Sequence, residues 1–432
     1  MSYRRIILFA LPIAALLSSA VIADDVVAYR GATIETVAEA GTIKDGIIVI
    51  RDGKIEAVGT DLKIPASARV VDVSGQTILP GLVNIYHPVT GGDTSSPSET
   101  RTIVAGGRTI TIPGAPSTTA PTFSKLSDNL DPLSLKTILS TQSRYGVGFA
   151  NIVTRGYGQS LSVRVTPGDV ENCIVNKDGC LYLSLTNTTE SLDVLRNGLR
   201  GRPSTSSSAS GFGGRGGGPR SGRGGDGRRG ESAPATAPPQ SETPAPATSS
   251  LTSLWQSVKD GNTPIILNVN NASTIMYVLE IRKEFEKVKI VLVASGANVY
   301  QTKDALKGTG ISVLLRAGLD IAPRSSDRIN VPKLLAESGI NFAFSSSLDN
   351  SLESMPDTPY FPVALLVKTG LPRKAALEAL TLAPARMLGL EKTVGSIEPG
   401  KQANLVFLDG DPLTVASKVR QVLVEGNSVY ED

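Results

Sequence analysis

The sequence predicts an α/β fold, a (β/α)8 TIM-like barrel accompanied by a small β-sandwich that is formed from the N- and C-terminal segments. Short strand-and-turn patterns occupy both ends of the chain, and strands alternate with helices between them. The 432 residues, 40% of them apolar, are enough for one large domain or two smaller ones. We therefore expect residues 26–79 and 392–432 to build the sandwich and residues 80–391 to build the barrel.

The two sandwich segments share one pattern. Apolar runs at 46–50 and 54–59 are separated by Asp52-Gly53, a pair typical of two-residue hairpin turns because both positions need a positive φ. The same alternation of short strands and turns returns at 403–430. Strands at both ends of one chain predict that the two ends pair with each other.

The segment between them alternates between strand and helix patterns. Strands are expected at 264–269, 289–294, 311–315 and 341–344. Helices are expected at 273–287, 302–307, 331–338, 372–380 and 384–388. Repeated β/α units flanked by a composite sandwich favour a closed parallel barrel over an open sheet.

Residues 201–250 interrupt this alternation. They contain 12 Gly and 7 Pro and are otherwise rich in Arg, Ser, Ala and Thr. Such a composition buries too little apolar surface to offset the entropy of ordering, so we expect a disordered insertion within the barrel. An Arg-Gly stretch can bind RNA, but Phe212 is the only aromatic residue here that could stack on a base.

The charge distribution argues against a nucleic-acid partner. The net charge is +3, and 201–250 holds six arginines against three acidic residues. The remainder is slightly acidic once Arg4 and Arg5 are also set aside, so the expected folded part has no basic excess.

The first 23 residues predict export. Arg4 and Arg5 precede an apolar stretch at 6–17, and Val21 and Ala23 stand at the −3 and −1 positions of a signal-peptide cleavage site. We expect a periplasmic or secreted protein. An uncleaved membrane anchor is the alternative, and no later apolar run is long enough to cross a membrane.

Cys173 and Cys180 are the only cysteines. They flank a turn at 176–179 inside a segment that is expected to be a strand hairpin. In an oxidising compartment they could form a disulfide, or they could remain two half-buried thiols.

Several motifs follow one another in an order found in one known family. They are Ile-Leu-Pro-Gly-Leu-Val-Asn at 78–84, Gly-Leu-Pro at 370–372, Ala-Pro-Ala-Arg-Met-Leu-Gly-Leu at 383–390 and Gly-Ser-Ile-Glu-Pro-Gly-Lys-Gln-Ala-Asn-Leu-Val at 395–406. With these motifs the chain resembles the amidohydrolase superfamily, close to its imidazolonepropionase-like and dihydroorotase-like metal-dependent hydrolases. The resemblance covers residues 26–100 and 260–432. It implies the barrel-plus-sandwich fold and hydrolysis of non-peptide C–N bonds.

The resemblance also implies where a metal centre would lie. In the family, four histidines and an aspartate hold one or two divalent ions, often zinc, which lower the pKa of a bound water. The corresponding positions in this chain are Tyr86, Pro88, Asn268 and Ser295 for the histidines and Ser346 or Ser347 for the aspartate. Proline has no side-chain donor, and Tyr, Asn and Ser are poor replacements for imidazole. We therefore expect no cofactor.

His87 and Asp349 are weaker candidates for acid/base chemistry. His87 is the only histidine, and between Tyr86 and Pro88 on a strand it should point away from the barrel axis. A structural or solvent-facing imidazole is therefore favoured.

Two functions follow from these observations. The first is an exported, catalytically degenerate amidohydrolase-fold protein that acts as a binding or assembly module. It would take a small polar ligand at the barrel mouth and pair with an amidohydrolase paralogue or a second copy. The alternative is an active hydrolase that uses Asp320, Asp349 or Glu353 with a metal preferring oxygen ligands, or works without a metal.

Overall fold

The computed structural model describes residues 26–89, 101–105, 108–112, 123–154, 156–185, 189–203, 246–345, 360–414 and 417–432. The predicted signal peptide at 1–23, most of the predicted insertion (204–245), and Ser346, Ser347, Asp349 and Glu353 lie outside these ranges.

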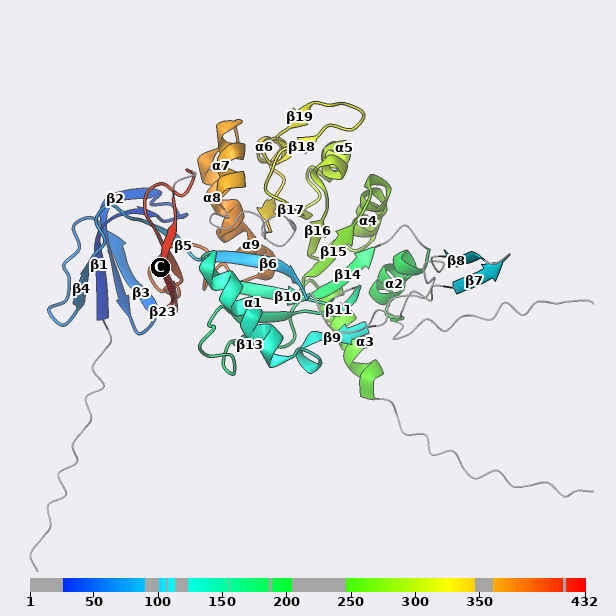
Figure 1. Ribbon diagram of the computed structural model, residues 1–432, viewed down its shortest axis with the longest axis horizontal. Coiled ribbons are helices and arrows are strands. Elements are labelled where there is room, and N and C mark those ends of the chain that lie inside the picture. Colours follow the sequence, from blue (N-terminus) through cyan, green and yellow to red (C-terminus); the bar gives the residue numbers. More distant parts are fainter. Residues whose placement is uncertain are drawn as a thin grey trace, which may run out of the picture.

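The two ends of the chain combine in one eight-stranded sheet, called the terminal sheet below (Figure 1). Its strands are β1 (Val26–Glu35), β2 (Thr42–Arg51), β3 (Lys54–Gly59), β4 (Arg69–Asp72), β5 (Thr77–Pro80), β21 (Leu405–Leu408), β22 (Val419–Val424) and β23 (Asn427–Glu431). The N- and C-terminal parts join where β5 pairs antiparallel with β21. The predicted pairing of the two ends is thus confirmed. All eight strands belong to one hydrogen-bonded sheet. The strand pairing therefore does not show the predicted sandwich of two separate sheets.

The hairpin predicted at Asp52-Gly53 is present between β2 and β3. Asp52 and Gly53 have φ values of 48° and 75°, as a two-residue hairpin turn requires.

The body of the molecule contains two further sheets with parallel neighbours. In one, β6 (Leu82–Pro88) pairs with β10 (Val147–Val153). In the other, the parallel order is β14 (Leu181–Leu185), β15 (Ile265–Val269), β16 (Ile290–Val293), β17 (Ser312–Leu315) and β20 (Phe342–Phe344). These seven are called the barrel strands below.

The barrel strands enclose a common interior. One buried cluster takes side chains from all seven, namely Ile85, Tyr86, Val153, Tyr182, Ile266, Val291, Val293, Leu314 and Ala343. However, no ladder within the described residues joins β20 to β6 or β10 to β14. The predicted α/β architecture is confirmed, whereas the described strands do not close into an eight-stranded barrel.

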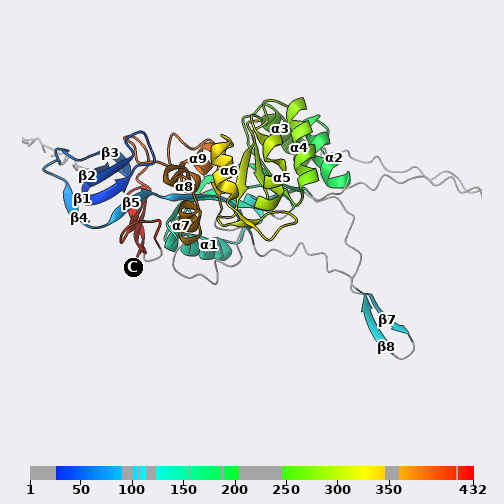
Figure 2. The ribbon, with the colours of Figure 1, turned by 90° about the horizontal axis from the view of Figure 1, so that it is seen from above.

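Helices pack around these strands (Figures 1 and 2), and Met387 from one of them also joins the interior cluster. They are α1 (Pro132–Arg144), α2 (Thr189–Leu199), α3 (Pro246–Lys259), α4 (Ala272–Glu284), α5 (Gly296–Leu306), α6 (Val331–Glu337), α7 (Phe361–Lys368), α8 (Arg373–Leu380) and α9 (Leu382–Leu388), with a 3-10 turn at Leu126–Asp128. None of the described helices is long and apolar enough to span a membrane.

Shorter strands complete the fold. They are β7 (Arg101–Ala105), β8 (Arg108–Ile112), β9 (Phe123–Lys125), β11 (Tyr157–Gln159), β12 (Leu161–Arg164), β13 (Ile174–Asn176), β18 (Asp320–Ile321) and β19 (Arg328–Ile329).

The C-terminal boundary predicted for the disordered insertion is wrong. Helix α3 begins at Pro246, inside the 201–250 segment. Its apolar residues Leu251, Leu254, Trp255 and Val258 recur at helical spacing and are buried, which gives the helix a face to pack. The composition of the preceding residues concealed this pattern.

The hairpin predicted around the two cysteines is also wrong. β13 pairs with β12 in one sheet, whereas β14 pairs with β11 and β15 in another. Cys173 and Cys180 are both buried free thiols. The Cys173 thiol donates to the Val170 carbonyl at 3.1 Å, and burial raises the pKa of Cys180 to about 12.

Candidate functional site at the barrel mouth

Tyr86, which is predicted to lie at the first ligand position, faces the barrel interior. It is 6% exposed and its ring lies 5.8 Å from that of Tyr182, centroid to centroid. The two hydroxyl oxygens are 3.4 Å apart, within hydrogen-bonding distance. Strand β6 thus places a phenol in the barrel interior.

Asn268, which is predicted to lie at the third ligand position, bonds to Tyr182. Its amide Nδ2 donates to the Tyr182 hydroxyl at 3.4 Å. Tyr86, Tyr182 and Asn268, from β6, β14 and β15, therefore form one hydrogen-bonded group, called the hydroxyl–amide cluster below. Sequence reasoning missed Tyr182, although one hydroxylated residue stands out within the apolar strand at Leu181–Leu185.

The cluster is uncharged at neutral pH. Burial is the main cause that raises the pKa of Tyr86 far above its ordinary value, and the adjacent Tyr182 adds to the effect. A phenol in this environment is neutral and both donates and accepts hydrogen bonds.

His87 and Pro88 are placed by the pairing of β6 with β10. His87 pairs with Ile152, which packs in the outer core against the helices, whereas Pro88 pairs with Val153 of the interior cluster. Paired residues share a face of the sheet, so this register places His87 on the outer face. Burial lowers the pKa of His87 below its ordinary value of 6.5, which leaves the imidazole neutral at physiological pH.

Ser295, which is predicted to lie at the fourth ligand position, is the N-cap of helix α5 and does not join the cluster. It is exposed, and its Oγ accepts from the Asn298 backbone N–H at 3.4 Å. This N-cap bond satisfies one of the free N–H groups of the first helical turn.

Asp320 lies against the start of the same helix. Its carboxylate accepts from the backbone N–H groups of Gly296 and Ala297, and burial raises its pKa despite these bonds and the nearby Arg316. A Cβ on Gly296 would overlap this carboxylate, so glycine permits the close approach. The Asp320 carboxylate is therefore already engaged in hydrogen bonds with the first backbone N–H groups of α5.

Ser345 links the two barrel sheets at the end of β20. Its Oγ donates to the Tyr86 carbonyl at 3.0 Å, and its residue is 3% exposed. The two candidates that follow it, Ser346 and Ser347, and also Asp349, lie outside the described ranges.

The donor set does not fit the metal centre of the family. Where the structure describes the chain, no three His, Cys, Asp or Glu side chains gather closely enough to hold a metal ion. Tyr86 and Asn268 are engaged with Tyr182, Ser295 caps a helix, and Pro88 has no side-chain donor.

Comparison with known proteins gives a family match over the C-terminal part of the chain. A model described as the amidohydrolase family matches residues 268–429. The solved amidohydrolase from Thermotoga maritima MSB8 covers 94% of this chain and 100% of its own, with a TM-score of 0.66 and 19% identity, a likeness that shows the fold. Residues 268–429 thus match the amidohydrolase family, and the chain as a whole has the fold of a solved amidohydrolase.

Two curated proteins resemble parts of this chain. The imidazolonepropionase of Methylobacterium sp. (strain 4-46) is 32% identical over 162 residues, which are 32% of this chain and 40% of that protein. Adenine deaminase 2 of Jannaschia sp. (strain CCS1) is 32% identical over 123 residues, or 27% of this chain and 19% of that protein. The chain thus spans less than half the length of either relative.

Proposed function

We propose that this amidohydrolase-superfamily protein binds a small polar molecule at the barrel mouth and does not hydrolyse C–N bonds through a metal-bound hydroxide. The hydroxyl–amide cluster carries the proposal, because at two of the predicted ligand positions, Tyr86 and Asn268, it holds neutral groups that each already bond to Tyr182.

The chemistry of the side chains supports this reading. Metal-dependent hydrolysis needs ligands that hold a divalent cation tightly enough to ionise its water near neutral pH. A neutral phenol and a carboxamide supply neither the affinity of imidazole nor the charge of a carboxylate. They can donate to and accept from an uncharged polar ligand, with the apolar interior strengthening each bond.

Metal analysis of the full chain tests the proposal. We expect zinc well below one equivalent in protein purified without chelator, and no hydrolysis of amide, lactam or β-aspartyl dipeptide substrates or deamination of adenine. Stoichiometric zinc that a chelator removes together with an activity would overturn the proposal.

A variant that restores the family ligands is the matched comparison. Tyr86→His, Pro88→His, Asn268→His and Ser295→His, combined with Ser346→Asp, should raise zinc content above that of the parent chain. Tyr86→Phe alone keeps the ring and should leave zinc content unchanged.

An active hydrolase with an oxygen-ligand metal is the second candidate. Among its three carboxylates, Asp320 is engaged by the start of α5, so the described residues give this candidate little support. Activity that appears only with added Mn²⁺ or Mg²⁺ would favour it.

Two further aspects of the proposal concern location and partners. We propose export through residues 1–23, which N-terminal sequencing of periplasmic or secreted protein would test.

We also propose that the chain pairs with a metal-binding paralogue or with a second copy of itself. Size-exclusion chromatography with and without the co-expressed paralogue distinguishes these two partners.

A further inference from the structure

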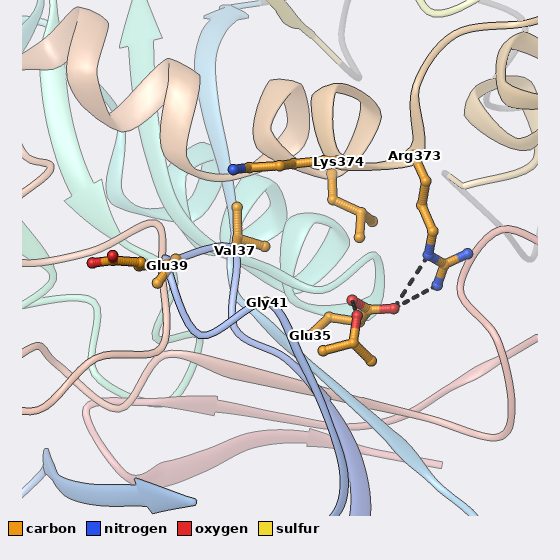
Figure 3. A pocket seen from close by; sticks show the side chains of 9 residues that line it. Glu35, Val37, Glu39, Gly41, Arg373 and Lys374 are labelled. Atoms are coloured by element: carbon orange, nitrogen blue, oxygen red, sulfur yellow. Dashed lines mark hydrogen bonds and ion pairs between the residues drawn. The ribbon is translucent and has the colours of Figure 1, made fainter.

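A second candidate site lies away from the barrel mouth, between the terminal sheet and the barrel helices (Figure 3). It is a pocket of about 300 Å³, bounded on one side by residues 35–42, which end β1 and begin β2, and on the other by the first turns of α8. This volume is at the lower end of the range for small-molecule sites, and domain junctions are frequent locations for them.

One end of the pocket is a fixed wall of paired charges. Arg373 donates from Nη2 to Glu35 Oε1 at 2.6 Å, and Thr42 Oγ1 donates to the other Glu35 oxygen at 2.6 Å. The Arg373 Nη1 also donates to both carboxylate oxygens of Asp411, at 2.9 and 3.0 Å. These hydrogen bonds fix the side chains at this end of the pocket, where one guanidinium faces two carboxylates and leaves a net charge of −1.

The other end holds two opposite charges with no partner. Glu39 extends from the β1–β2 turn and Lys374 from α8, and Figure 3 shows both side chains directed toward the end of the pocket opposite the Glu35–Arg373 pair. Both are exposed, and neither has an ion pair or hydrogen bond among the described residues.

Aliphatic side chains line the pocket together with these charges. Val37, Ala38 and Leu377 contribute its apolar surface. Val37 has a φ of 52°, an unusual conformation for a β-branched residue, and hydrogen bonds from Thr36 to Gly41 hold the turn around it. Strained residues of this kind concentrate at ligand sites.

We propose that this pocket binds a zwitterionic amino acid with an aliphatic side chain, such as leucine. Its carboxylate would pair with Lys374, its ammonium group with Glu39, and its side chain would cover Val37 and Leu377. Exposed ion pairs contribute little individually, so the site is a weak one, with a Kd of about millimolar.

Calorimetric titration of the full chain with leucine and three analogues tests the ligand chemistry. Isocaproate lacks the ammonium group, isoamylamine lacks the carboxylate, and glycine lacks the side chain. We expect leucine to bind most tightly, with each analogue weaker by about threefold or more. Absence of binding at the solubility limit of leucine, or equal binding of isocaproate or isoamylamine, would overturn the proposal.

Charge reversal tests the residues. Lys374→Glu and Glu39→Lys should each weaken leucine binding by more than about tenfold, because each places like charges together. The doubly reversed variant should recover to within about threefold of the parent, since the ligand can bind turned end for end. Lys136→Glu, at an exposed position on α1, is the control and should have no effect. Leucine binding that survives both single reversals would place the ligand elsewhere.

Discussion

Two fully buried tyrosines of the barrel body differ in one respect, the partner of the hydroxyl group. Tyr157 and Tyr360 are both 0% exposed. The Tyr157 hydroxyl accepts from Trp255 Nε1 at 2.8 Å, whereas the Tyr360 hydroxyl has no hydrogen-bond partner among the described residues. A buried polar group without a partner carries an uncompensated loss of hydration.

The same substitution should therefore have opposite effects at the two positions. Tyr157→Phe leaves the indole N–H unsatisfied and should lower the free energy of unfolding by about 1–3 kcal/mol. Tyr360→Phe removes the unsatisfied hydroxyl and should leave that free energy unchanged or raise it by up to about 1 kcal/mol. Urea unfolding of both variants measures the difference. Equal losses at the two sites would show that Tyr360 has a partner.

The pKa of His87 can be measured directly, because this residue is the only histidine in the chain. Burial lowers the pKa of His87 below 6.5, so the unfolded chain binds this proton more tightly than the folded one. The contribution of His87 to stability should therefore be complete above pH 6.5 and decline as the pH falls below it. The Hε1 resonance of this imidazole, which needs no assignment, should titrate below pH 6.5 in the folded protein. A pKa at or above the unfolded value would contradict its burial.

The sequence points to Tyr86 and Asn268 as candidate residues, but not to the group that they form with Tyr182. Tyr86 and Asn268 were located by their order relative to the family motifs. Their shared partner Tyr182 was not, because it lies in β14, within the stretch at 101–200 that the resemblance does not cover. Ser295 was expected at the mouth with them, but a serine before a glycine at a strand end can equally begin a helix, which is the role it takes.

At the scale of elements, predictions succeeded where the hydrophobic period was uninterrupted. The helices expected at 273–287 and 331–338 correspond to α4 and α6, and the strand expected at 311–315 corresponds to β17. The helix expected at 302–307 starts earlier, because α5 begins at Gly296 with polar and small residues that give no periodic signal. Pairing of strands across sheets, as at β13 and β14, depends on distant residues and cannot be derived from local turn signals.

Helices α2 and α3 pack closely where Gly198 meets Trp255. Gly198 of α2 faces Trp255 of α3 so closely that an added Cβ would overlap the indole ring. Alanine ordinarily stabilises a helix relative to glycine by about 0.5–1 kcal/mol. Here the methyl group must displace a side chain that is 1% exposed, so Gly198→Ala should instead destabilise the protein by about 1–3 kcal/mol.

Fluorescence of Trp255, the only tryptophan, reports the unfolding of this contact. Asn197→Ala, at the exposed neighbouring position of α2, is the control and should change stability by less than about 0.5 kcal/mol. If Gly198→Ala were as stable as the parent, the two helices would have to lie farther apart than described.

At the scale of the whole molecule, Arg373 connects three parts that are distant in sequence. From α8 it reaches Glu35 at the end of β1 and Asp411 in the connection between β21 and β22. The Glu35 side chain is only 9% exposed, so this ion pair offsets part of the hydration that the carboxylate loses on burial. The barrel helices are thereby tied to both terminal segments of the sheet.

Replacing Arg373 should consequently loosen the junction between the terminal sheet and the barrel. Arg373→Met leaves Glu35 buried with Thr42 as its remaining partner and should lower the free energy of unfolding by about 2–3 kcal/mol, less than for a fully buried pair because Arg373 is 38% exposed. Adding Glu35→Gln removes the unpaired charge and should restore part of this loss. Arg420→Met breaks exposed pairs with Asp409 and Asp432 and should cost less than about 1 kcal/mol. Urea unfolding measures the free energy of unfolding of the three variants. Equal losses for Arg373→Met and Arg420→Met would mean that the stability of the junction does not depend on the buried Glu35 charge.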